Sequence, residues 1–396
     1  MATAANAERA YFDWNATTPL RQEARQAFVD AAGRLGNPSS VHAEGRAARR
    51  LVEDARERLA ALLGARAADV IFTSSGTEAN MLALSPAIET DAQKRPRDRL
   101  LLSAVEHSSV RAGGRFTRDA IEEIAVDAAG RVDLTALGEA LSRCERPLVS
   151  IMLANNETGV IAPVAEAAAV VHAAGGLLHC DATQAVGRIA CDIGALGADL
   201  ITLSAHKIGG AKGVGALVRA REDIHFPDPL IRGGGQERGL RAGTENVSGI
   251  AAFGAAATAA RTLRVSEAAH MQTLRDLLEA GLSAISPDAV IFGTGAERLP
   301  NTTLFAVEGI KAETAIIALD LEGVAVSSGA ACSSGKVQPS HVLAAMGVSP
   351  ALARGALRLS LGWETTKADV ERFLNAWRKV NGALSKGAKE KRGIAA

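Results

Sequence analysis

The sequence is poor in cysteine and carries no excess of charge. Its 396 residues include only four cysteines, Cys144, Cys180, Cys191 and Cys332, and no CxxC pair. This excludes a disulfide framework and a closed zinc site, and it is typical of a reducing compartment such as the cytoplasm. Lysine plus arginine equals aspartate plus glutamate, 44 each, so no overall field attracts nucleic acid or an anionic membrane. We therefore expect small molecules or proteins as partners.

Long apolar runs are missing as well. The longest run of small apolar residues, 249–260, falls short of the roughly 20 residues that a membrane-spanning helix needs. The first residues show no basic region followed by an apolar core, so we expect no secretory signal and a cytoplasmic location. With 47% hydrophobic residues the chain can bury a large core, and its length favours two domains.

The first two thirds of the chain alternate apolar runs of strand length with helical patterns. An apolar stripe over 44–64 predicts a helix that ends at Gly64. Six runs predict strands, at 70–75, 99–107, 147–156, 175–183, 198–207 and 213–218. This alternation is typical of parallel βαβ units. We therefore expect an α/β domain built on a mostly parallel sheet.

The pattern changes after about residue 262. A helix is followed by strand patterns at 301–307, 324–328 and 356–362, and then by a helix that Thr366 and Asp369 open. This order of elements predicts a second, smaller α+β domain.

Reactive side chains stand directly after several of the predicted strands. They are His107, Asn156, Asp181, His206 and Lys207. Because ligands bind at the carboxyl edge of an open α/β sheet, we expect these residues to face one crevice.

A turn of small residues, TSSGTEAN, joins the strand at 70–75 to a helix. The amides of Gly76 and Thr77 would lie at the helix N-terminus, which suits a phosphate. A P-loop is excluded because no GxxxxGK[ST] occurs, and a dinucleotide site is excluded because GVGALV lacks the third glycine. A capped surface helix is the alternative interpretation.

Lys207 and Asp181 together indicate a cofactor. Lys207 stands at a strand end between a histidine and glycines, so a ligand could reach its amine. Asp181 lies 26 residues earlier, one predicted strand away. Pyridoxal phosphate needs this combination, a lysine for the Schiff base and a carboxylate for the pyridinium nitrogen.

Cys332 lies in the stretch AVSSGAACSSG, which has no large side chain to pack against the sulfur. A buried cysteine normally has apolar neighbours. Two interpretations stay open on this pattern alone: an incidental loop cysteine, or an accessible thiol that is present for its reactivity.

The chain resembles the pyridoxal-phosphate cysteine desulfurases of the nitrogen-fixation and iron–sulfur-cluster type, within the class V aminotransferase superfamily. The resemblance covers nearly the whole chain. The motifs that carry it are YFDWNATTP, GNPSSVH, TSSGTEAN, VEHSSV, NNETGV, DATQAVG, SAHKIGG, RAGTENV, SSGAACSSG and ALRLSLG, in this order.

The resemblance implies roles for residues of this chain. Lys207 would form the Schiff base with pyridoxal 5′-phosphate, Asp181 would face the ring nitrogen, and His107 would stack on the ring. Thr244 would reach the phosphate from the other subunit of a homodimer. The remaining implied contacts are Gln184 and Asn156 to the ring hydroxyl, Gly76, Thr77, Ser204 and His206 to the phosphate, and Arg358 with Asn15 and Asn37 to the substrate.

It further implies the fold of type I pyridoxal-phosphate transferases. A large domain, 16–261, would hold a mostly parallel seven-stranded sheet, and a small domain, 1–15 plus 262–396, would carry the Cys332 loop. The implied reaction converts L-cysteine to L-alanine, leaves the sulfur as a persulfide on Cys332 and passes it to an acceptor protein such as an iron–sulfur scaffold. No metal, direct nucleic-acid contact or membrane contact is implied.

Two other functions remain open. A selenocysteine lyase or a class V aminotransferase could use the same scaffold, because Lys207 and Asp181 serve all these reactions. A non-catalytic sulfur- or metal-binding protein is the alternative from another class.

Overall fold

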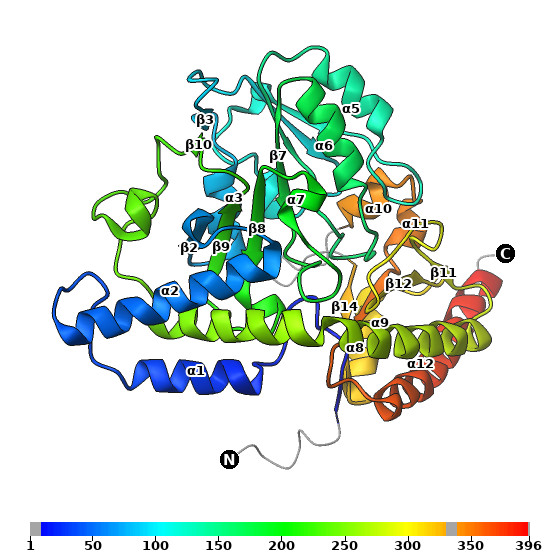
Figure 1. Ribbon diagram of the computed structural model, residues 1–396. Helices are drawn as coiled ribbons and strands as arrows, with labels where there is room; N and C mark the ends of the chain where they lie inside the picture. The colour runs from blue at the N-terminus through cyan, green and yellow to red at the C-terminus, as the bar shows by residue number, and fades with distance from the viewer. Residues whose placement is uncertain (1–8, 330–338, 395–396) are drawn as a thin grey trace.

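The computed structural model describes residues 9–329 and 339–394, so Cys332 lies outside the described residues. A seven-stranded sheet forms the centre of the larger part of the molecule (Figure 1). In spatial order its strands are β2 (Val70–Thr73), β9 (Gly215–Arg219), β8 (Leu200–Ser204), β7 (Leu177–Asp181), β6 (Pro147–Ser150), β4 (Arg99–Ser103) and β5 (Ile121–Ile124).

Most neighbouring strands of this sheet are parallel. Strands β5, β4, β6, β7 and β8 run in one direction, whereas β9 is antiparallel to both of its neighbours, β8 and β2. The mostly parallel seven-stranded sheet expected above is therefore confirmed. The expected βαβ pattern fails only at β8–β9, because residues 205–214 are fewer than the about 12 that a parallel crossover needs.

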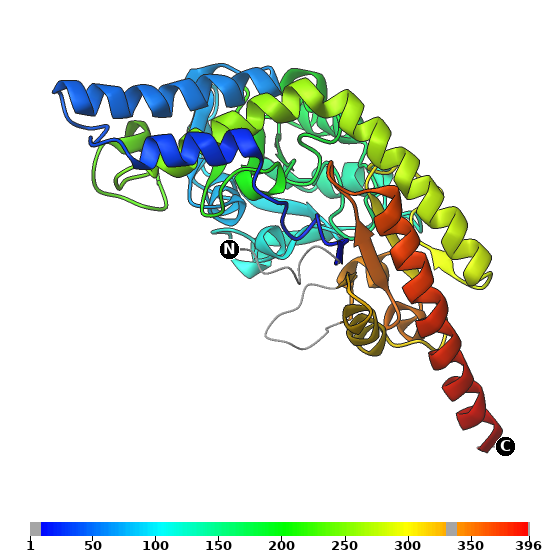
Figure 2. The same ribbon diagram turned by 90° about the horizontal axis from the view of Figure 1, so that it is seen from below.

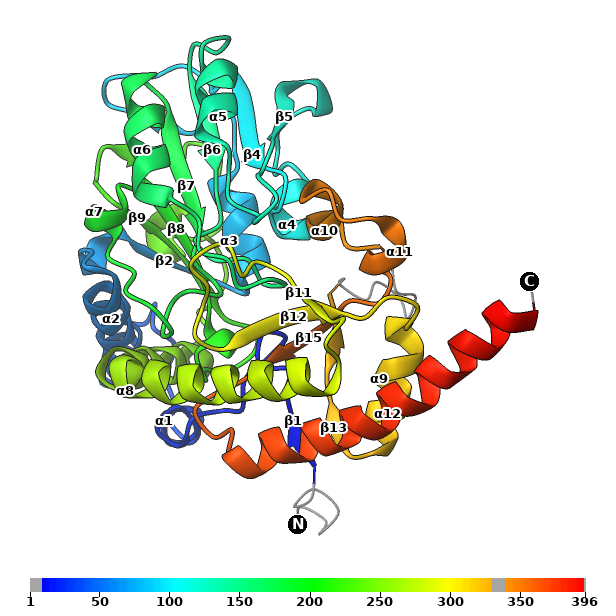
Figure 3. The same ribbon diagram turned by 90° about the vertical axis from the view of Figure 1, so that its right-hand side faces the viewer.

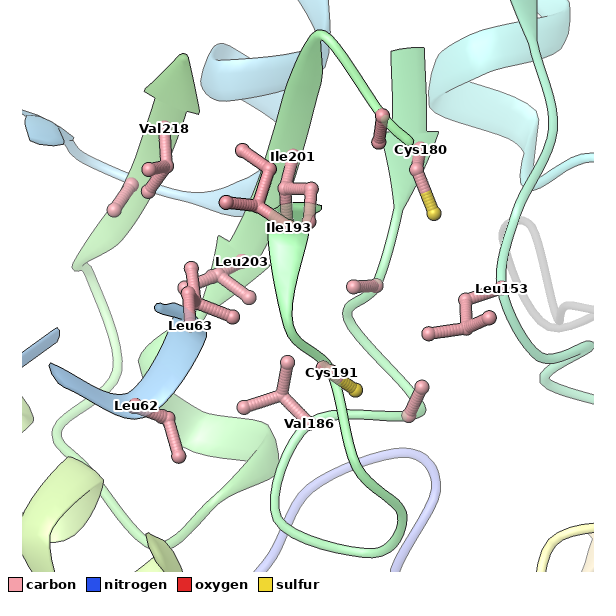
Figure 4. Close-up of a cluster of buried hydrophobic side chains, with 14 of the residues drawn as sticks. Leu62, Leu63, Leu153, Cys180, Val186, Cys191, Ile193, Ile201, Leu203 and Val218 are labelled. Carbon is pink, nitrogen blue, oxygen red and sulfur yellow. The ribbon is translucent and has the colours of Figure 1, made fainter. Parts of the chain in front are cut away.

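Helices cover both faces of the sheet. Successive strand residues point to opposite faces, so Phe72 joins one buried cluster and its neighbour Ile71 joins another. The first face carries α2 (Ala43–Leu63), α5 (Leu134–Leu141), α6 (Val164–Ala173), α7 (Ile193–Leu196) and the first part of α8 (Val247–Ile285). The second face carries α3 (Gly76–Ala83) and α4 (Ser108–Arg111). Figure 4 shows part of the first cluster, where Cys180 and Cys191 pack among aliphatic side chains, as expected for structural cysteines.

The long helix α8 connects two cores. Its first part contributes Phe253 to the core of the large sheet, and its second part contributes Leu278 to a separate core. The second core lies against a four-stranded antiparallel sheet in the order β11 (Val290–Ile291), β12 (Thr302–Ala306), β15 (Leu357–Ser360) and β14 (Ser327–Ser328). Figure 3 shows this sheet beside the end of α8. The domain boundary at residue 261 remains a prediction, and it falls inside a continuous helix.

The remaining elements complete the second core and the edges of the molecule. Strand β1 (Ala10–Tyr11) pairs in parallel with β13 (Val324–Ala325), so the N-terminal segment joins the C-terminal part of the chain. Figure 2 shows α1 and α2 beside α8, and α12 extending past the body. The other elements are α1 (Gln22–Ala32), β3 (Glu89–Thr90), β10 (Ile224–His225), α9 (Ala312–Leu321), α10 (His341–Ala345), α11 (Pro350–Ala353) and α12 (Lys367–Ile394).

Helix α12 begins as its sequence predicts. Thr366 Oγ1 accepts from the Asp369 amide at 3.2 Å, and the Asp369 carboxylate accepts from the Thr366 amide at 2.8 Å. This reciprocal cap satisfies two amides that the first turn would leave without partners. Over the described parts of the chain, every helix is too short or too polar to cross a membrane.

Candidate active site

A cavity of about 170 Å³ lies at the carboxyl ends of β7 and β8. Asp181 is the last residue of β7, Ser204 is the last residue of β8, and Lys207 follows in the short 3-10 turn Ala205–Lys207. All the predicted cofactor residues except Thr244 line this one cavity: Gly76, Thr77, His107, Asn156, Asp181, Gln184, Ser204, His206 and Lys207. Their convergence follows from the sheet, because parallel strands end at one edge.

The Lys207 amine is partly buried, with two arginines and two carboxylates near it. Its Nζ donates to the backbone oxygens of Asn15 at 2.5 Å and Ala16 at 2.7 Å. Burial, together with the charges of Arg358 and Arg188, lowers the pKa of Lys207 to about 7. A large fraction of the amine is therefore unprotonated near neutral pH, so its lone pair can act as a nucleophile or a base.

Asp181 is held by two donors. Its Oδ1 accepts from the Thr183 amide at 2.9 Å, and its Oδ2 accepts from Asn80 Nδ2 at 2.9 Å. Asn80 Nδ2 also donates to Ser109 Oγ at 2.9 Å. Asn80 is 1% exposed, and its Oδ1 has no hydrogen-bond partner among the described residues. An acceptor with no partner is therefore available beside the carboxylate.

His107 caps α4, and Ser109 holds its ring in place. Its Nδ1 accepts from the Ser109 amide at 3.2 Å and contacts Ser109 Oγ at 2.8 Å. The neutral ring therefore carries its proton on Nε2. Burial lowers the pKa of His107, so the neutral form predominates near neutral pH. A neutral ring can lie flat against another ring without adding a charge to the cavity.

The N-terminus of α3 faces the cavity. Ser75 caps this helix by accepting from the Glu78 amide at 3.1 Å, and the helix dipole favours negative charge at its N-terminus. A Cβ on Gly76 would lie 3.3 Å from the Ser204 Cβ, so glycine lets the helix N-terminus approach β8 closely. Burial and two lysine charges lower the pKa of His206 to about 4, so its ring is neutral near neutral pH.

Two of the predicted substrate residues lie next to the cavity. Arg358, on β15, donates to the Asn156 backbone oxygen at 3.0 Å and to the Asp13 carboxylate at 2.7 Å. Asn15 Nδ2 donates to the same Asn156 oxygen at 3.2 Å. The Nε of Arg358 is buried and has no partner among the described residues. The four-stranded sheet therefore contributes an arginine to the edge of the site.

Two predicted residues are not brought to this cavity by their own chain. Asn37 is exposed in the segment between α1 and α2, where its Oδ1 accepts from the Ser39 amide at 2.9 Å. Thr244 is exposed and lines a separate cavity of about 270 Å³. Their predicted roles remain predictions, as does that of Cys332.

Sequence reasoning missed Asn80, although it lies within the TSSGTEAN motif. The available signal was an asparagine on an otherwise apolar helix face, one turn after Gly76 and beside Ala79 and Ala83. It also missed Arg188, which follows the DATQ segment and is buried beside Gln184.

The comparison with known proteins agrees with this arrangement. The model of the class V aminotransferase family matches residues 10–373. The chain belongs to this family. The resemblance stated from the motifs and the type of fold expected from it are thereby confirmed.

Other members of the family match the chain along almost all of its length. A cysteine desulfurase of Cereibacter sphaeroides is 44% identical over 373 residues, which cover 93% of this chain and 94% of that protein. The cysteine desulfurase IscS of Dictyoglomus turgidum is 40% identical over 375 residues, with the same two coverages, 93% and 94%. The crystal structure of a NifS-like protein from Rickettsia africae superposes with a TM-score of 0.85 at 34% identity, covering 95% of this chain and 100% of that one.

Proposed function

We propose that this protein is a cysteine desulfurase that converts L-cysteine to L-alanine and takes the sulfur onto Cys332. The observation that carries this proposal is the convergence of Lys207, Asp181 and His107 on one cavity, in a chain 44% identical to a protein named cysteine desulfurase. An enzyme of this family also explains why an amine of low proton affinity lies beside a carboxylate.

The residues of the cavity fit pyridoxal 5′-phosphate. Lys207 offers an amine for its aldehyde, and Asp181 suits a protonated ring nitrogen. The free acceptor Asn80 Oδ1 is available to a bound group beside that carboxylate. The N-terminus of α3, at Gly76 and Thr77, suits the phosphate. When bound, this cofactor supplies an electron sink that makes the substrate Cα–H acidic.

The protein's own groups would bind the substrate and move its protons. Arg358 would hold the substrate carboxylate, because its Nε is directed at no other acceptor among the described residues. The unprotonated Lys207 amine would take the Cα proton. His107, with its proton on Nε2, or the protonated Lys207 would return a proton to the carbon that loses sulfur.

Sulfur transfer to Cys332 needs no external oxidant. The Cys332 thiolate would attack the sulfur of the substrate, forming an S–S bond while the carbon–sulfur bond breaks. The electron pair of the broken bond remains with the carbon fragment, which takes up a proton to give L-alanine. L-cysteine and a protein thiol thus give L-alanine and a protein persulfide, with all atoms and electrons balanced.

The partners we infer are a second copy of the chain and a protein that accepts sulfur. Thr244 is exposed and lies outside the Lys207 cavity of its own chain, which supports a role at the phosphate site of a partner subunit. An acceptor such as an iron–sulfur scaffold would take the persulfide sulfur, and the reducing cytoplasm suits both the free thiol and this transfer.

The test measures alanine and sulfide together after incubation with L-cysteine and a reductant. We expect equal amounts of both from the wild type, and almost none from Lys207→Ala or Cys332→Ser. Cys144→Ser is the matched control, because Cys144 is half-buried outside the cavity, and it should keep wild-type activity. Mass spectrometry after one turnover without reductant should find one added sulfur on the peptide that contains Cys332.

Other outcomes would replace the proposal. An added sulfur on Cys144, Cys180 or Cys191, or a wild-type rate in Cys332→Ser, would remove the persulfide step on Cys332. A keto acid as the product would indicate an aminotransferase, and a rate with selenocysteine far above that with cysteine would indicate a selenocysteine lyase. A protein that binds no pyridoxal phosphate would not be an enzyme of this kind.

A further inference from the structure

Arg188 is a buried cation with no carboxylate partner among the residues that the structure describes. It is 6% exposed and lies in the loop after β7. Its Nη1 donates to the backbone oxygen and to the side-chain Oε1 of Gln184, each at 2.6 Å. In the part of the chain that the structure describes, its hydrogen bonds go to Gln184 alone, and no carboxylate approaches it. Burial and the charge of Arg358 lower the pKa of Arg188 to about 9, so its charge persists near neutral pH.

The contact with Arg188 fixes the orientation of the Gln184 amide. An arginine can only donate, so the oxygen of the amide must face Arg188 and the Nε2 group must face away. The Nε2 group donates to the backbone oxygen of Asn15 at 3.0 Å. The same oxygen accepts from Lys207 Nζ at 2.5 Å. Arg188 is therefore linked to Lys207 through the Gln184 side chain and the Asn15 backbone oxygen, which accepts from both Gln184 and Lys207.

The positive charges near Lys207 differ in whether a carboxylate offsets them. Arg358 lies close, but it forms an ion pair with Asp13 at 2.7 Å, so the two opposite charges partly offset each other. Asp181 faces Lys207 from β7 and favours its charged form. The neighbouring rings, His206 and His107, have lowered pKa values and add little charge. Among the groups that act on Lys207 in the described part of the chain, Arg188 is thus the positive charge without a paired carboxylate.

We propose that Arg188 is a positioning residue, which fixes the Gln184 side chain toward the cavity and disfavours a second positive charge on the Lys207 amine. This role rests on the proposed function, in which Lys207 acts as an unprotonated amine. It explains why an arginine is kept in the interior without the carboxylate that a buried charge normally needs. The pKa of Lys207, lowered to about 7, agrees with it.

The test measures the proton affinity of Lys207 directly. The full-length protein, freed of cofactor, is labelled with trace acetic anhydride between pH 5.5 and 10, and the label on Lys207 is quantified by mass spectrometry. We expect a midpoint near pH 7 in the wild type. Arg188→Gln and Arg188→Met should raise it by about one pH unit. At pH 7 the unprotonated fraction, and hence the labelling rate, would then fall about fivefold. Arg188→Lys retains the charge, so its Lys207 midpoint should lie close to the wild-type value.

Arg97→Gln is the matched control. Arg97 is also buried, lacks an ion-pair partner, and has an Nη2 group without a hydrogen-bond partner among the described residues, but it lies before β4, away from the cavity. Its loss should leave the Lys207 midpoint unchanged. In the cofactor-loaded enzyme, the pH midpoint of the visible absorbance change should rise in Arg188→Gln and remain in place in Arg97→Gln.

A folded Arg188→Gln or Arg188→Met protein with a wild-type Lys207 midpoint would overturn the inference, and so would an equal shift in Arg97→Gln. Because labelling needs neither cofactor nor cysteine, its result is separate from the test of alanine formation. A protein that makes no alanine but shows the midpoint shift would contradict the proposed function alone.

Discussion

Glu157 is a buried acid that the reaction proposed above does not use. It is 2% exposed, and its Oε2 accepts from Ser340 Oγ at 2.5 Å. Burial raises the pKa of Glu157 to about 7, against the opposing effects of the Ser340 hydrogen bond and the Arg358 charge. The native protein therefore retains a proton on Glu157 at pH values where the unfolded chain has lost it. Stability must then fall as pH rises from the unfolded pKa of 4.5 through the folded pKa of about 7.

The size of the effect follows from the two pKa values. Each pKa unit of difference is worth about 1.4 kcal/mol of unfolding free energy. A carboxyl that titrates at 4.5 in the unfolded chain and at about 7 in the folded one therefore lowers the free energy of unfolding by about 2.5 kcal/mol between pH 5 and pH 8.5. Glu157→Gln keeps the shape and an acceptor for the Ser340 hydroxyl but cannot ionise, so it should not show this loss. With the usual entropy of unfolding per residue, 2.5 kcal/mol corresponds to about 3 °C in Tm for a chain that unfolds as one unit.

The assay is thermal unfolding of the wild type and Glu157→Gln at several values of pH between 5 and 8.5. We expect the Tm of the variant to rise relative to the wild type by about 3 °C over this range, mostly below pH 7, and to level off above it. Glu57→Gln, an exposed change on α2, is the control and should run parallel to the wild type. Parallel curves for wild type and Glu157→Gln would refute the reasoning, because they would mean that Glu157 is already ionised in the folded protein at pH 5.

Two further predictions concern buried hydrogen bonds. Asn80→Ala removes a donor to the Asp181 carboxylate, and a hydrogen bond to a charged group is worth about 1.5–3 kcal/mol, so pyridoxal phosphate should bind about 10- to 100-fold more weakly in equilibrium dialysis; unchanged affinity would mean that Thr183 alone suffices to hold Asp181. Glu237→Gln leaves the buried Arg56 without its bidentate carboxylate, at 2.8 Å for both contacts, and should cost about 3–5 kcal/mol in urea unfolding. The double variant Arg56→Met, Glu237→Leu should lose less than the single one, and an equal or larger loss would contradict this account.

Much of the fold could be predicted because the strands that form its centre are apolar on both faces. The strand at Leu200–Ser204 is buried at every position, and three of its five residues are large aliphatic ones. The strand Ile121–Ile124 was missed, because it is an edge strand with two glutamates and is only partly buried. It joins the sheet by pairing with β4, which its own residues do not predict.

The site divides in the same way. Lys207 and Asp181 could be predicted because each follows an apolar strand, and the carboxyl ends of such strands meet at one edge. Asn80 and Arg188 were missed, because a polar residue in a helix or loop normally lies at the surface, and their importance comes from contacts formed only on folding. Asn80 meets Asp181 across 101 positions of the sequence.

The pairing of β1 with β13 sets the order in which parts of the fold can form during translation. A ribosome delivers Ala10 and Tyr11 first, but their partners Val324 and Ala325 emerge near the end of the chain. The large sheet, complete at Arg219, can form while the N-terminal strand is still waiting. Yet Asn15, which supplies the oxygen that Lys207 and Gln184 share, lies four residues after the end of that strand. A nascent chain can therefore form the large sheet early, whereas the Asn15 oxygen that binds Lys207 is held in place only after β1 has paired with β13. A chain that lacks β13 would therefore lack a complete active site.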